Sequence, residues 1–324
     1  MTATGSRGQL RFIPAGDVEA FGYPRAAAAL EVALRDGLDP SADPARSSIA
    51  VDGSASLLYM PSITATGIGV KLVTHNPRNA ATADPLVHGV YVLFDRDTLA
   101  PVALLDGAAL TTLRTPAVSV VAVRQALRRF QRPLNVVIFG LGPQGIGHLD
   151  ALRDIATRDG DIYPPATVTC VARRTHDDRL PRRGGVAVTG VLAGSAEMIE
   201  ALIAANVVVC ATSAQTPLFD SSVLSDQVVV IAVGSHSPDA REIDGPWCGR
   251  SLVIVEDVAT AMRECGEVVQ ACGAGVLTSN NIVSMAEVVT GRVGHDIQAG
   301  PTLFKGSGMA WQDLVVAQSI ASTV

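Results

Sequence analysis

The sequence predicts an α/β protein in which a doubly wound, Rossmann-type domain is joined to a second, α+β domain. Three observations lead to this fold class. The 324 residues suffice for about two domains. The second half alternates continuously apolar runs with helical stretches, and a glycine-rich turn follows the first of these runs. The first hundred residues instead carry short strand candidates between turn residues.

The first part of the chain predicts one helix, a meandering sheet and a second helical segment. Residues 24–38 are rich in Ala and Leu and end at a glycine, which favours a helix. Short segments rich in Thr, Val and Tyr then predict antiparallel strands, bounded by Gly, Pro, Asn and Asp. These strands are expected at 55–60, 66–74, 89–94 and 101–105, with a turn at 95–98. Residues 107–130 predict a long helical segment that Pro116 either kinks or divides.

From residue 134 onwards, the apolar runs are continuous rather than alternating. Strands that are buried on both faces of a parallel sheet have this pattern. They are expected at 134–139, 167–171, 186–188, 207–211, 228–233 and 252–255, with connecting helices such as 145–157 and 195–204. A last amphipathic stretch, 309–320, predicts a final helix.

Composition and charge exclude several classes of function. The 25 Lys and Arg against 31 Asp and Glu leave a net charge of −6, which argues against nucleic acid as the main partner. We expect no membrane segment, because no apolar stretch approaches about 18 residues, and no secretory signal, because the first residues contain no apolar core. Five cysteines without metal-ligand spacing predict free thiols in a cytoplasmic protein without a metal site. Glu256, Asp257 and Glu264 are interpreted as helix-start and surface acids.

A glycine-rich turn carries the prediction of a cofactor. Gly140, Gly142 and Gly145 form G-x-G-x-x-G between an apolar strand and a helix, the context in which this motif binds a dinucleotide. The first glycine permits a tight turn, and the second lets the backbone approach the pyrophosphate. The N–H groups at the start of the helix favour an anion. Pro143 and Gln144 complete the predicted cofactor turn.

The end of the next strand indicates which nicotinamide cofactor is used. NAD sites usually place an Asp or Glu there, which binds the ribose 2′-hydroxyl. Here the strand ends in Arg173 and Arg174, with no acid at its tip. Arginine offers permanently charged, bidentate donors to a 2′-phosphate. We therefore predict NADP(H), with NAD(H) as the alternative.

Several motifs, taken in order and with their spacing, resemble the ornithine cyclodeaminase/μ-crystallin family across essentially the whole chain. They are Met60-Pro61, Gly69-Val70-Lys71, Asn76-Pro77-Arg78-Asn79, Asp106 with 110–115, 140–144, 211–213, 234–242 and 303–305. The resemblance implies a substrate and dimerisation domain at 1–116, completed by 302–324, and a Rossmann domain at 117–301. It also implies a homodimer, with the substrate held between the domains and facing the nicotinamide.

The resemblance further implies site residues. In the family, three cations hold the substrate carboxylate, and Arg46, Lys71 and Arg114 match them here. A bidentate arginine with a lysine beside it suits an α-carboxylate, although Arg46 alone would be interpreted as a surface cation. Lys71 and Lys305 are the only lysines among the 25 basic residues. The other expected contacts are Met60 and Ser307 for substrate, and Thr115, Ala211, Thr212, Ser213, Val233, Gly234, Phe304 and Lys305 for cofactor.

One segment distinguishes activities within the family. Cyclodeaminases carry an Asp in a G-x-D-x-P segment, and the matching residue here is His236, between Gly234 and Pro238. Its imidazole is either an acid–base group near neutral pH or a structural loop histidine. The G-S-H-x-P form resembles the branch of amino-acid dehydrogenases and cyclic ketimine reductases.

We therefore expect an NADPH-dependent reductase that transfers hydride to the C=N bond of a cyclic imino acid. Its substrate would be Δ1-pyrroline-2-carboxylate or Δ1-piperideine-2-carboxylate, and its product proline or pipecolate. Lys71, Arg114 and His236 are the expected catalytic residues. The alternatives are an ornithine cyclodeaminase, another amino-acid dehydrogenase, and a μ-crystallin-like protein that binds NADPH or a small ligand without turnover.

Overall fold

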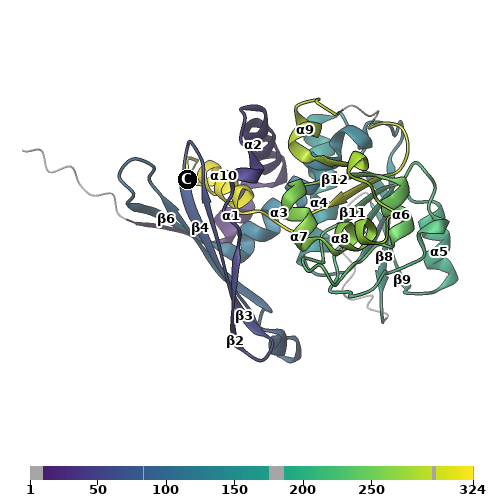
Figure 1. Cartoon of the computed structure of the whole chain (residues 1–324), viewed down its shortest axis with the longest axis horizontal. Coiled ribbons are helices and arrows are strands. Elements are labelled where there is room, and N and C mark those ends of the chain that lie inside the picture. The colour runs from purple at the N-terminus through teal and green to yellow at the C-terminus, as the bar shows by residue number, and fades with distance from the viewer. Residues whose placement is uncertain (1–9, 83, 175–185, 294–296, 324) are drawn as a thin grey trace, which may run out of the picture. The chain divides into compact units, whose positions relative to one another are not determined.

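The computed structural model describes residues 10–82, 84–174, 186–293 and 297–323 (Figure 1). The chain divides into two compact units. Met1–Ala33, Ala42–Arg114 and Met309–Val324 form the first, which we call the mixed-sheet unit. Leu34–Ser41 and Thr115–Gly308 form the second, the parallel-sheet unit. The roles predicted for the two parts, substrate binding with dimerisation and dinucleotide binding, stay predictions at this point.

The mixed-sheet unit contains a six-stranded sheet in the order β1-β6-β5-β4-β3-β2. The strands are β1 (Arg11–Ile13), β2 (Ser47–Asp52), β3 (Ala55–Ile63), β4 (Ile68–His75), β5 (Val87–Phe94) and β6 (Pro101–Asp106). Strands β3 to β6 form the predicted antiparallel meander, β2 pairs with β3 in the same antiparallel way, and β1 pairs in parallel with β6. The sequence did not predict β1 or β2.

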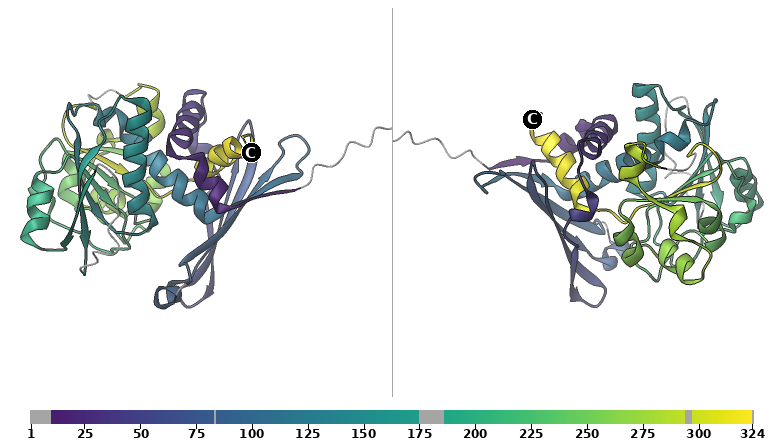
Figure 2. Two further views of the ribbon diagram at one scale, coloured as in Figure 1. Left: turned by 180° about the vertical axis from the view of Figure 1, so that it is seen from behind. Right: turned by 45° about the horizontal axis from the view of Figure 1, so that its top comes forward.

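One face of this sheet is covered by the C-terminal helix. Helix α10 (Ala310–Ala321) packs across β3, β4 and β5, as the views in Figures 1 and 2 show. Helices α1 (Ala15–Phe21) and α2 (Tyr23–Arg35) precede the meander. Because side chains alternate along a strand, Lys71 on β4 faces α10 and is buried, whereas Leu72 is exposed on the other face.

The parallel-sheet unit contains eight strands in the order β13-β12-β14-β11-β10-β7-β8-β9. They are β7 (Leu134–Phe139), β8 (Pro165–Ala172), β9 (Ala187–Leu192), β10 (Val207–Cys210), β11 (Val229–Ala232), β12 (Leu252–Val255), β13 (Ile282–Ser284) and β14 (Thr302–Lys305). Every pair is parallel. The unit is therefore the predicted doubly wound, Rossmann-type domain.

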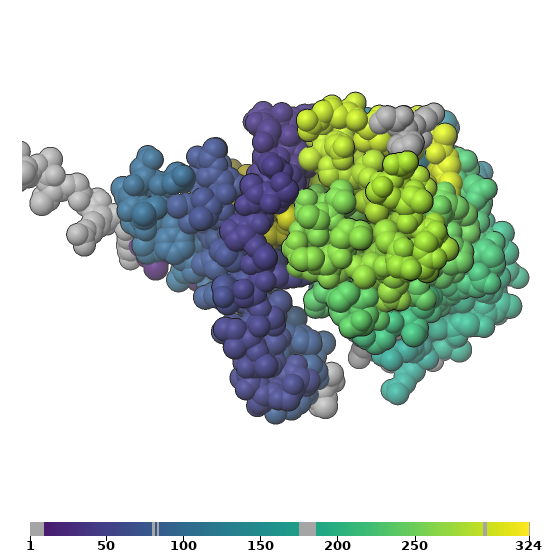
Figure 3. Space-filling view, in the orientation of Figure 1, coloured from purple at the N-terminus to yellow at the C-terminus, as the bar shows by residue number. Residues whose placement is uncertain are grey.

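Helices cover both faces of the parallel sheet (Figure 2). They are α4 (Pro143–Asp159), α5 (Ala196–Ile203), α6 (Gly245–Arg250), α7 (Val258–Glu264), α8 (Gly266–Gly273) and α9 (Met285–Val289). Helix α8 packs against both α6 and α7, and this part of the chain lies at the surface in the light green region of Figure 3. Its core side includes the fully buried Trp247, which packs among strand residues such as Val208 and Leu303. Four short 3-10 helices complete the described chain: η1 (Pro40–Ala42), η2 (Pro77–Ala81), η4 (Ser221–Val223) and η5 (Ser279–Asn281).

Two features differ from the sequence-based expectations. Helix α3 (Gly107–Leu127) runs through Pro116 without interruption, so this segment is one helix rather than two. Strand β14 lies between β11 and β12, so residues 302–308 belong to the parallel-sheet unit and not to the substrate domain. Only pairing with distant strands defines this four-residue strand, which explains why no local pattern revealed it.

Across the residues that the structure describes, no helix combines the length and apolar character needed to cross a membrane. Within the same residues, no group of three His, Cys, Asp or Glu side chains is placed to hold a metal ion. All five cysteines are free thiols, as predicted, and four of them are buried. The cytoplasmic location inferred from them stays a prediction.

Candidate functional site

Four charged side chains gather in the mixed-sheet unit, and we call them the cationic cluster: Arg46, Lys71, Arg114 and Asp313. Lys71 comes from β4, Arg114 from α3 and Asp313 from α10, while Arg46 directly precedes β2. Lys71 is 2% exposed, Arg114 4% and Asp313 0%. Charges buried to this degree require partners, because desolvation of an ion costs several kcal/mol.

Helix α10 supplies those partners. Asp313 accepts a hydrogen bond from Lys71 Nζ at 2.7 Å through Oδ2 and one from Arg114 Nε at 3.2 Å through Oδ1. The preceding residue, Gln312, accepts from Arg114 Nη1 at 2.7 Å through Oε1. Lys71 Nζ also donates to Thr111 Oγ1 at 3.2 Å. Two consecutive helix residues therefore hold the Arg114 guanidinium, and a single carboxylate joins it to Lys71.

The electrostatic balance in the cluster favours a lysine that titrates close to neutral pH. Burial lowers the pKa of Lys71 to about 8, with Asp313 opposing the shift and the positive charges of Arg114 and Arg46 adding to it. The influence of Arg46 places its charge near Lys71, so the structure brings together the three cations that the sequence singled out. A lysine with this pKa can bind an anion and can also transfer a proton.

Tyr91 and Gly69 adjoin Lys71 on the covered face of the sheet. Tyr91 on β5 is the cross-strand partner of Lys71. Its hydroxyl is buried without a hydrogen-bond partner within the described residues. A Cβ at Gly69 would lie 2.1 Å from the Tyr91 hydroxyl oxygen, so the ring requires the glycine of the G-x-K segment. Burial raises the pKa of Tyr91 well above its ordinary value, so the phenol is neutral.

Asp43 and Met60 lie at the border of the cationic cluster. Burial raises the pKa of Asp43 to about 6, although its carboxylate accepts hydrogen bonds from Ser62 Oγ at 2.6 Å and from the Trp311 N–H. The charge of Asp313 also contributes to this rise. Met60 is buried on β3, directly opposite Lys71 in the strand pairing. Its predicted contact with substrate is therefore compatible with its position beside the ammonium group.

In the parallel-sheet unit, the turn after β7 fits a dinucleotide. Gly140 has a φ of +99°, and a Cβ there would lie 2.4 Å from the Ala211 carbonyl oxygen. At Gly142, no described heavy atom lies within 4 Å of the Cβ position, so the backbone is open to a ligand. A Cβ at Gly145 would lie 1.9 Å from the Gly140 carbonyl oxygen, which explains the third glycine. The three glycines thus provide the turn, the open approach and the close packing that a pyrophosphate site needs.

Helix α4 starts directly after this open backbone. Gly142 precedes its first residue and has no side chain with which to cap the N–H groups of the first turn. These N–H groups and the helix dipole are therefore available to an anion. Pro143 is exposed and Gln144 half-buried. At the end of β8, Arg173 and Arg174 are both exposed.

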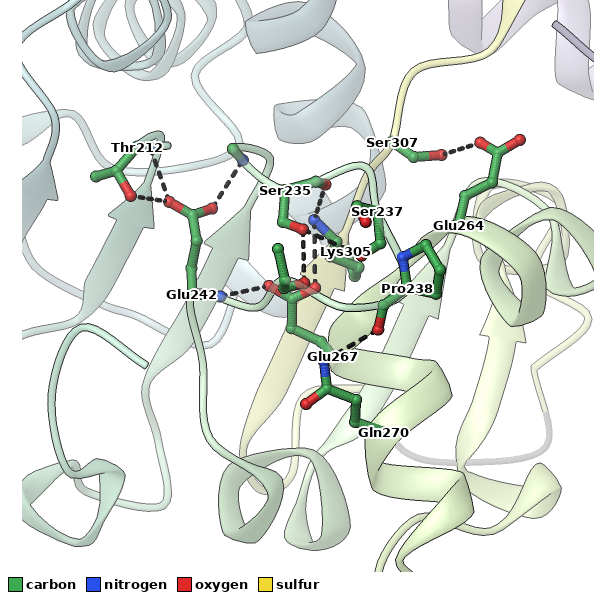
Figure 4. A network of polar contacts seen from close by, with 12 residues as sticks. Thr212, Ser235, Ser237, Pro238, Glu242, Glu264, Glu267, Gln270, Lys305 and Ser307 are labelled. Atoms are coloured by element: carbon green, nitrogen blue, oxygen red, sulfur yellow. Dashed lines mark hydrogen bonds and ion pairs between the residues drawn. The ribbon is translucent and has the colours of Figure 1, made fainter. Parts of the chain in front are cut away.

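A second polar cluster joins the carboxyl ends of β10, β11 and β14 (Figure 4), and we call it the edge network: Thr212, Gly234, Ser235, Glu242, Glu267 and Lys305. Glu242 is fully buried. Its Oε1 accepts hydrogen bonds from the Thr212 N–H and Oγ1, both at 2.7 Å, and its Oε2 accepts from the Gly234 N–H at 2.7 Å. One carboxylate therefore binds two loops.

Lys305 forms the other half of the edge network. Its Nζ donates to the Ser235 carbonyl oxygen at 2.6 Å and lies 3.4 Å from Glu267 Oε2. Glu267 Oε1 in turn accepts from the Glu242 N–H at 2.8 Å. Lys305 and Phe304 are both 0% exposed, so the structure places them beneath the loops. Because both side chains are completely buried, their positions do not support the predicted direct contact with a cofactor.

The remaining predicted residues, apart from Thr115 on α3, lie in the loops that follow β10, β11 and β14. His236 is exposed in the loop after β11, and Ser307 is half-buried. The N–H groups of Ser307 and Gly308 donate to Glu256 Oε2 at 2.9 Å each. Glu256 is 3% exposed, so its interpretation as a surface acid was wrong. The other predicted cofactor residues are half-buried (Thr115, Ala211, Thr212, Val233 and Gly234) or exposed (Ser213).

Sequence reasoning missed the acids that organise both clusters. Asp313, Glu242 and Glu267 are each at most 1% exposed. Asp313 and Glu267 lie outside the motifs, and Glu242 closes the 234–242 motif but was given no role. For Asp313 a signal was present, because it is the one charged residue between Ala310 and Ala317, a stretch in which every other residue except Gln312 is apolar. An acid at such a position predicts a buried partner of opposite charge.

Comparisons with known proteins agree with this geometry. The model of the ornithine cyclodeaminase/mu-crystallin family matches residues 25–324. A Δ1-pyrroline-2-carboxylate/Δ1-piperideine-2-carboxylate reductase from Azospirillum brasilense is 28% identical over 303 residues, which is 92% of this chain and 90% of that protein.

Solved structures show the same fold. The Thermococcus litoralis Δ1-pyrroline-2-carboxylate reductase, in complex with NADH and L-proline, has a TM-score of 0.80 at 23% identity and covers 97% of each chain. An archaeal alanine dehydrogenase dimer with bound NAD also has a TM-score of 0.80, at 22% identity over 97% of this chain and 95% of that one. At these sequence identities, the structural similarity supports a shared fold and nothing further.

Proposed function

The chain belongs to the ornithine cyclodeaminase/mu-crystallin family, and we propose that it is an NAD(P)H-dependent oxidoreductase that reduces the C=N bond of a cyclic imino acid. The observation that carries this proposal is the cationic cluster, in which Asp313 pairs with Lys71 and Arg114, and the charge of Arg46 also acts on Lys71. The substrate class is a small cyclic imine with a carboxylate, as in the name of the Azospirillum relative. The products are then proline or pipecolate.

The cationic cluster matches both ends of such a substrate. Arg46, Lys71 and Arg114 exceed the charge of Asp313, so the cluster has positive charge to offer a substrate carboxylate. Gln312 and Asp313 fix the orientation of the Arg114 guanidinium, so little side-chain entropy is lost when the anion binds. Lys71, with its pKa near 8, can keep the imine nitrogen protonated and so make its carbon more electrophilic.

The parallel-sheet unit supports the cofactor assignment. When bound, a reduced nicotinamide supplies the hydride that adds to the C=N carbon, while the nitrogen keeps the proton. The backbone at Gly142 and the first turn of α4 would hold the pyrophosphate. Arg173 and Arg174 would hold a 2′-phosphate, because both are exposed directly after β8 and no acid stands at its tip. We therefore favour NADP(H) over NAD(H).

Substrate turnover tests the reaction. We expect loss of NADPH absorbance when Δ1-pyrroline-2-carboxylate or Δ1-piperideine-2-carboxylate is added. Arg114→Met should abolish it, whereas Arg78→Met is the matched control, because Arg78 is exposed and bound to Asp52 at 2.8 Å. Formation of proline and ammonia from ornithine with catalytic NAD would instead identify a cyclodeaminase. Tight NADPH binding without turnover on any imino or keto acid would identify a binding protein.

Cofactor choice is tested separately. The double variant R173S/R174S should weaken NADPH binding by about tenfold to a hundredfold and leave NADH binding unchanged, because only the 2′-phosphate contact is lost. Arg263→Ser, at an exposed arginine on α7, serves as the control. Equal affinity of the unmodified protein for NADH and NADPH would contradict the preference.

The open face of the six-stranded sheet supports a homodimer. Exposed apolar side chains cover the face opposite α10: Phe12, Ile49, Tyr59, Ile63, Leu72 and Val102. Such a surface is typical of a protein interface, and the archaeal alanine dehydrogenase of the same fold is a dimer. Leu72→Glu should yield monomers in light scattering, whereas Ile203→Glu, at an exposed apolar position on α5, should not. A monomeric unmodified protein would overturn this proposal.

A further inference from the structure

Three loops form one continuous edge at the carboxyl ends of neighbouring strands β7, β10 and β11. Gly140, at the end of β7, packs so closely on Ala211 and Thr212 that a Cβ would lie within 3.3 Å of both. Gly234, at the end of β11, packs on Thr212 in the same way, because a Cβ there would lie 2.0 Å from the Thr212 carbonyl oxygen. The loop after β10 therefore contacts both the loop after β7 and the loop after β11.

The order of these loops indicates which half of a dinucleotide each one meets. In a doubly wound sheet, the ligand lies outside the carboxyl ends of the strands, with the pyrophosphate at the first glycine-rich turn. The ribose of the adenosine half lies on the side of β8, where Arg173 and Arg174 are found. The loops after β10 and β11 lie on the opposite side of β7, so they meet the nicotinamide half.

The side chain of Glu242 holds the loop after β10 and the loop after β11 together. Its three accepted hydrogen bonds, all 2.7 Å long, come from Thr212 after β10 and Gly234 after β11. A Cβ at Gly234 would lie 2.6 Å from Glu242 Oε1, so the glycine is required for the carboxylate to fit. Figure 4 shows the carboxylate between the two loops, with Lys305 and Glu267 beside it.

Lys305 and Glu267 attach this assembly to the sheet. Lys305, at the end of β14, fixes the carbonyl group of Ser235, which is the residue before His236. Glu267, on α8, fixes the N–H of Glu242 at 2.8 Å. The loop that carries His236 is therefore held at the two residues before it, by Glu242 at Gly234 and by Lys305 at Ser235.

We propose that Glu242 is a positioning residue for the nicotinamide half of the cofactor, because its buried carboxylate holds the loops after β10 and β11 in one fixed surface. This inference rests on the proposed function, since it assumes that NADP(H) binds at this edge. Glu242 itself is 0% exposed, so its side chain is not open to a cofactor or a substrate. It acts through the backbone of Thr212 and Gly234.

The test compares Glu242→Gln with the unmodified protein in binding of two ligands. The amide keeps the size of the side chain, but its NH₂ group cannot accept from a donor, so one loop is released. We expect NADPH to bind about tenfold to a hundredfold more weakly, since bonds to a charged group are lost. Adenosine 2′,5′-bisphosphate, which lacks the nicotinamide half, should keep its affinity.

Two further variants keep the test decisive. Glu287→Gln is the matched control, because Glu287 accepts two bonds in a capping box on α9, where Gln serves equally well. Glu242→Asp retains the charge but is one methylene shorter, so it should bind NADPH more tightly than E242Q and more weakly than the unmodified protein. If E242Q proves too unstable to measure, E242D is compared directly with the unmodified protein for both ligands.

The outcomes separate the two proposals. If the unmodified protein binds neither ligand, the proposed cofactor is wrong. If it binds both and E242Q binds NADPH equally well, the role of Glu242 is wrong. Equal weakening of both ligands by E242Q, or no difference between E242D and E242Q, also overturns that role, because either result indicates a general loss of structure.

Discussion

The two lysines of this chain are equally buried but lie in opposite electrostatic surroundings. Lys71 is 2% exposed and Lys305 is 0% exposed. Burial lowers the pKa of both, yet the pKa of Lys71 ends at about 8 whereas that of Lys305 ends above its ordinary value. Lys71 faces one carboxylate and two guanidinium groups. Lys305 faces the carboxylates of Glu267 and Glu242, which outweigh its desolvation.

This difference shows that the surrounding charges, rather than burial, decide what a buried lysine can do. Around Lys71 the positive charges outnumber the one carboxylate that it faces, so the site can bind an anion. Lys71 can also transfer a proton near neutral pH, which suits chemistry on a substrate. Lys305 stays charged at all physiological pH values and is bound to Ser235 and Glu267, which suits a structural role. The same substitution at both positions should therefore have different consequences.

The largest effect is expected on activity from Lys71→Met. We expect a loss of about 10²- to 10³-fold in kcat/KM for a cyclic imino acid, because a charged contact to the substrate carboxylate is removed. NADPH affinity should not change, since the glycine-rich turn lies in the other unit. Steady-state kinetics and cofactor titration measure both quantities. An unchanged kcat/KM would remove Lys71 from the site.

The next effect is expected on stability from Lys305→Met. The free energy of unfolding should fall by about 3–5 kcal/mol, because Glu267 and Glu242 are left buried without their cation. Denaturant unfolding measures this value, and the double variant K305M/E267M should recover part of the loss. Lys71→Met is the comparison, and it should destabilise less because Arg114 still pairs with Asp313 at 3.2 Å. If the two lysine variants lose equal stability, the contrast between them is wrong.

A smaller effect is expected from pH. Because Lys71 must be protonated to bind an anion and its folded-state pKa is about 8, kcat/KM should fall with rising pH. The fall should approach about tenfold per pH unit above this pKa. Below it the lysine is fully charged, so no loss from this group is expected.

Lys71→Arg provides the control for the pH profile. An arginine stays charged at all these pH values, so whatever activity remains should no longer decline near pH 8. A decline that persists unchanged in this variant would belong to another group, such as the cofactor or the substrate imine.

The smallest effect is expected from Tyr91→Phe. The hydroxyl has no hydrogen-bond partner within the described residues, so its removal should change the free energy of unfolding by less than about 1 kcal/mol. Tyr163→Phe, at an exposed tyrosine outside the proposed dimer surface, is the control. A large drop in activity with unchanged stability would instead show that the Tyr91 hydroxyl binds the substrate.

The cations of the site could be predicted from the sequence, but the carboxylates that bind them could not. Lys71 and Arg114 were predicted, together with Arg46, as cations that hold the substrate carboxylate. The common partner of Lys71 and Arg114, Asp313, lies 242 and 199 residues away from them along the chain. Glu267 was missed for the same reason. Glu242 closes the 234–242 motif but was given no role, because no local pattern indicates that its carboxylate will be buried against a distant loop. Motifs identify residues that act on ligands more readily than residues that hold those residues in place.

By itself, the sequence determined the parallel sheet, because strands buried on both faces require continuous apolar runs. It also determined the cofactor turn, because only glycine allows the left-handed backbone at position 140 and the close packing at position 145. The tertiary structure alone decided where β14 pairs and which charges surround each lysine. Strand pairing and electrostatic interactions depend on distance in space, and residues far apart in sequence set both of them.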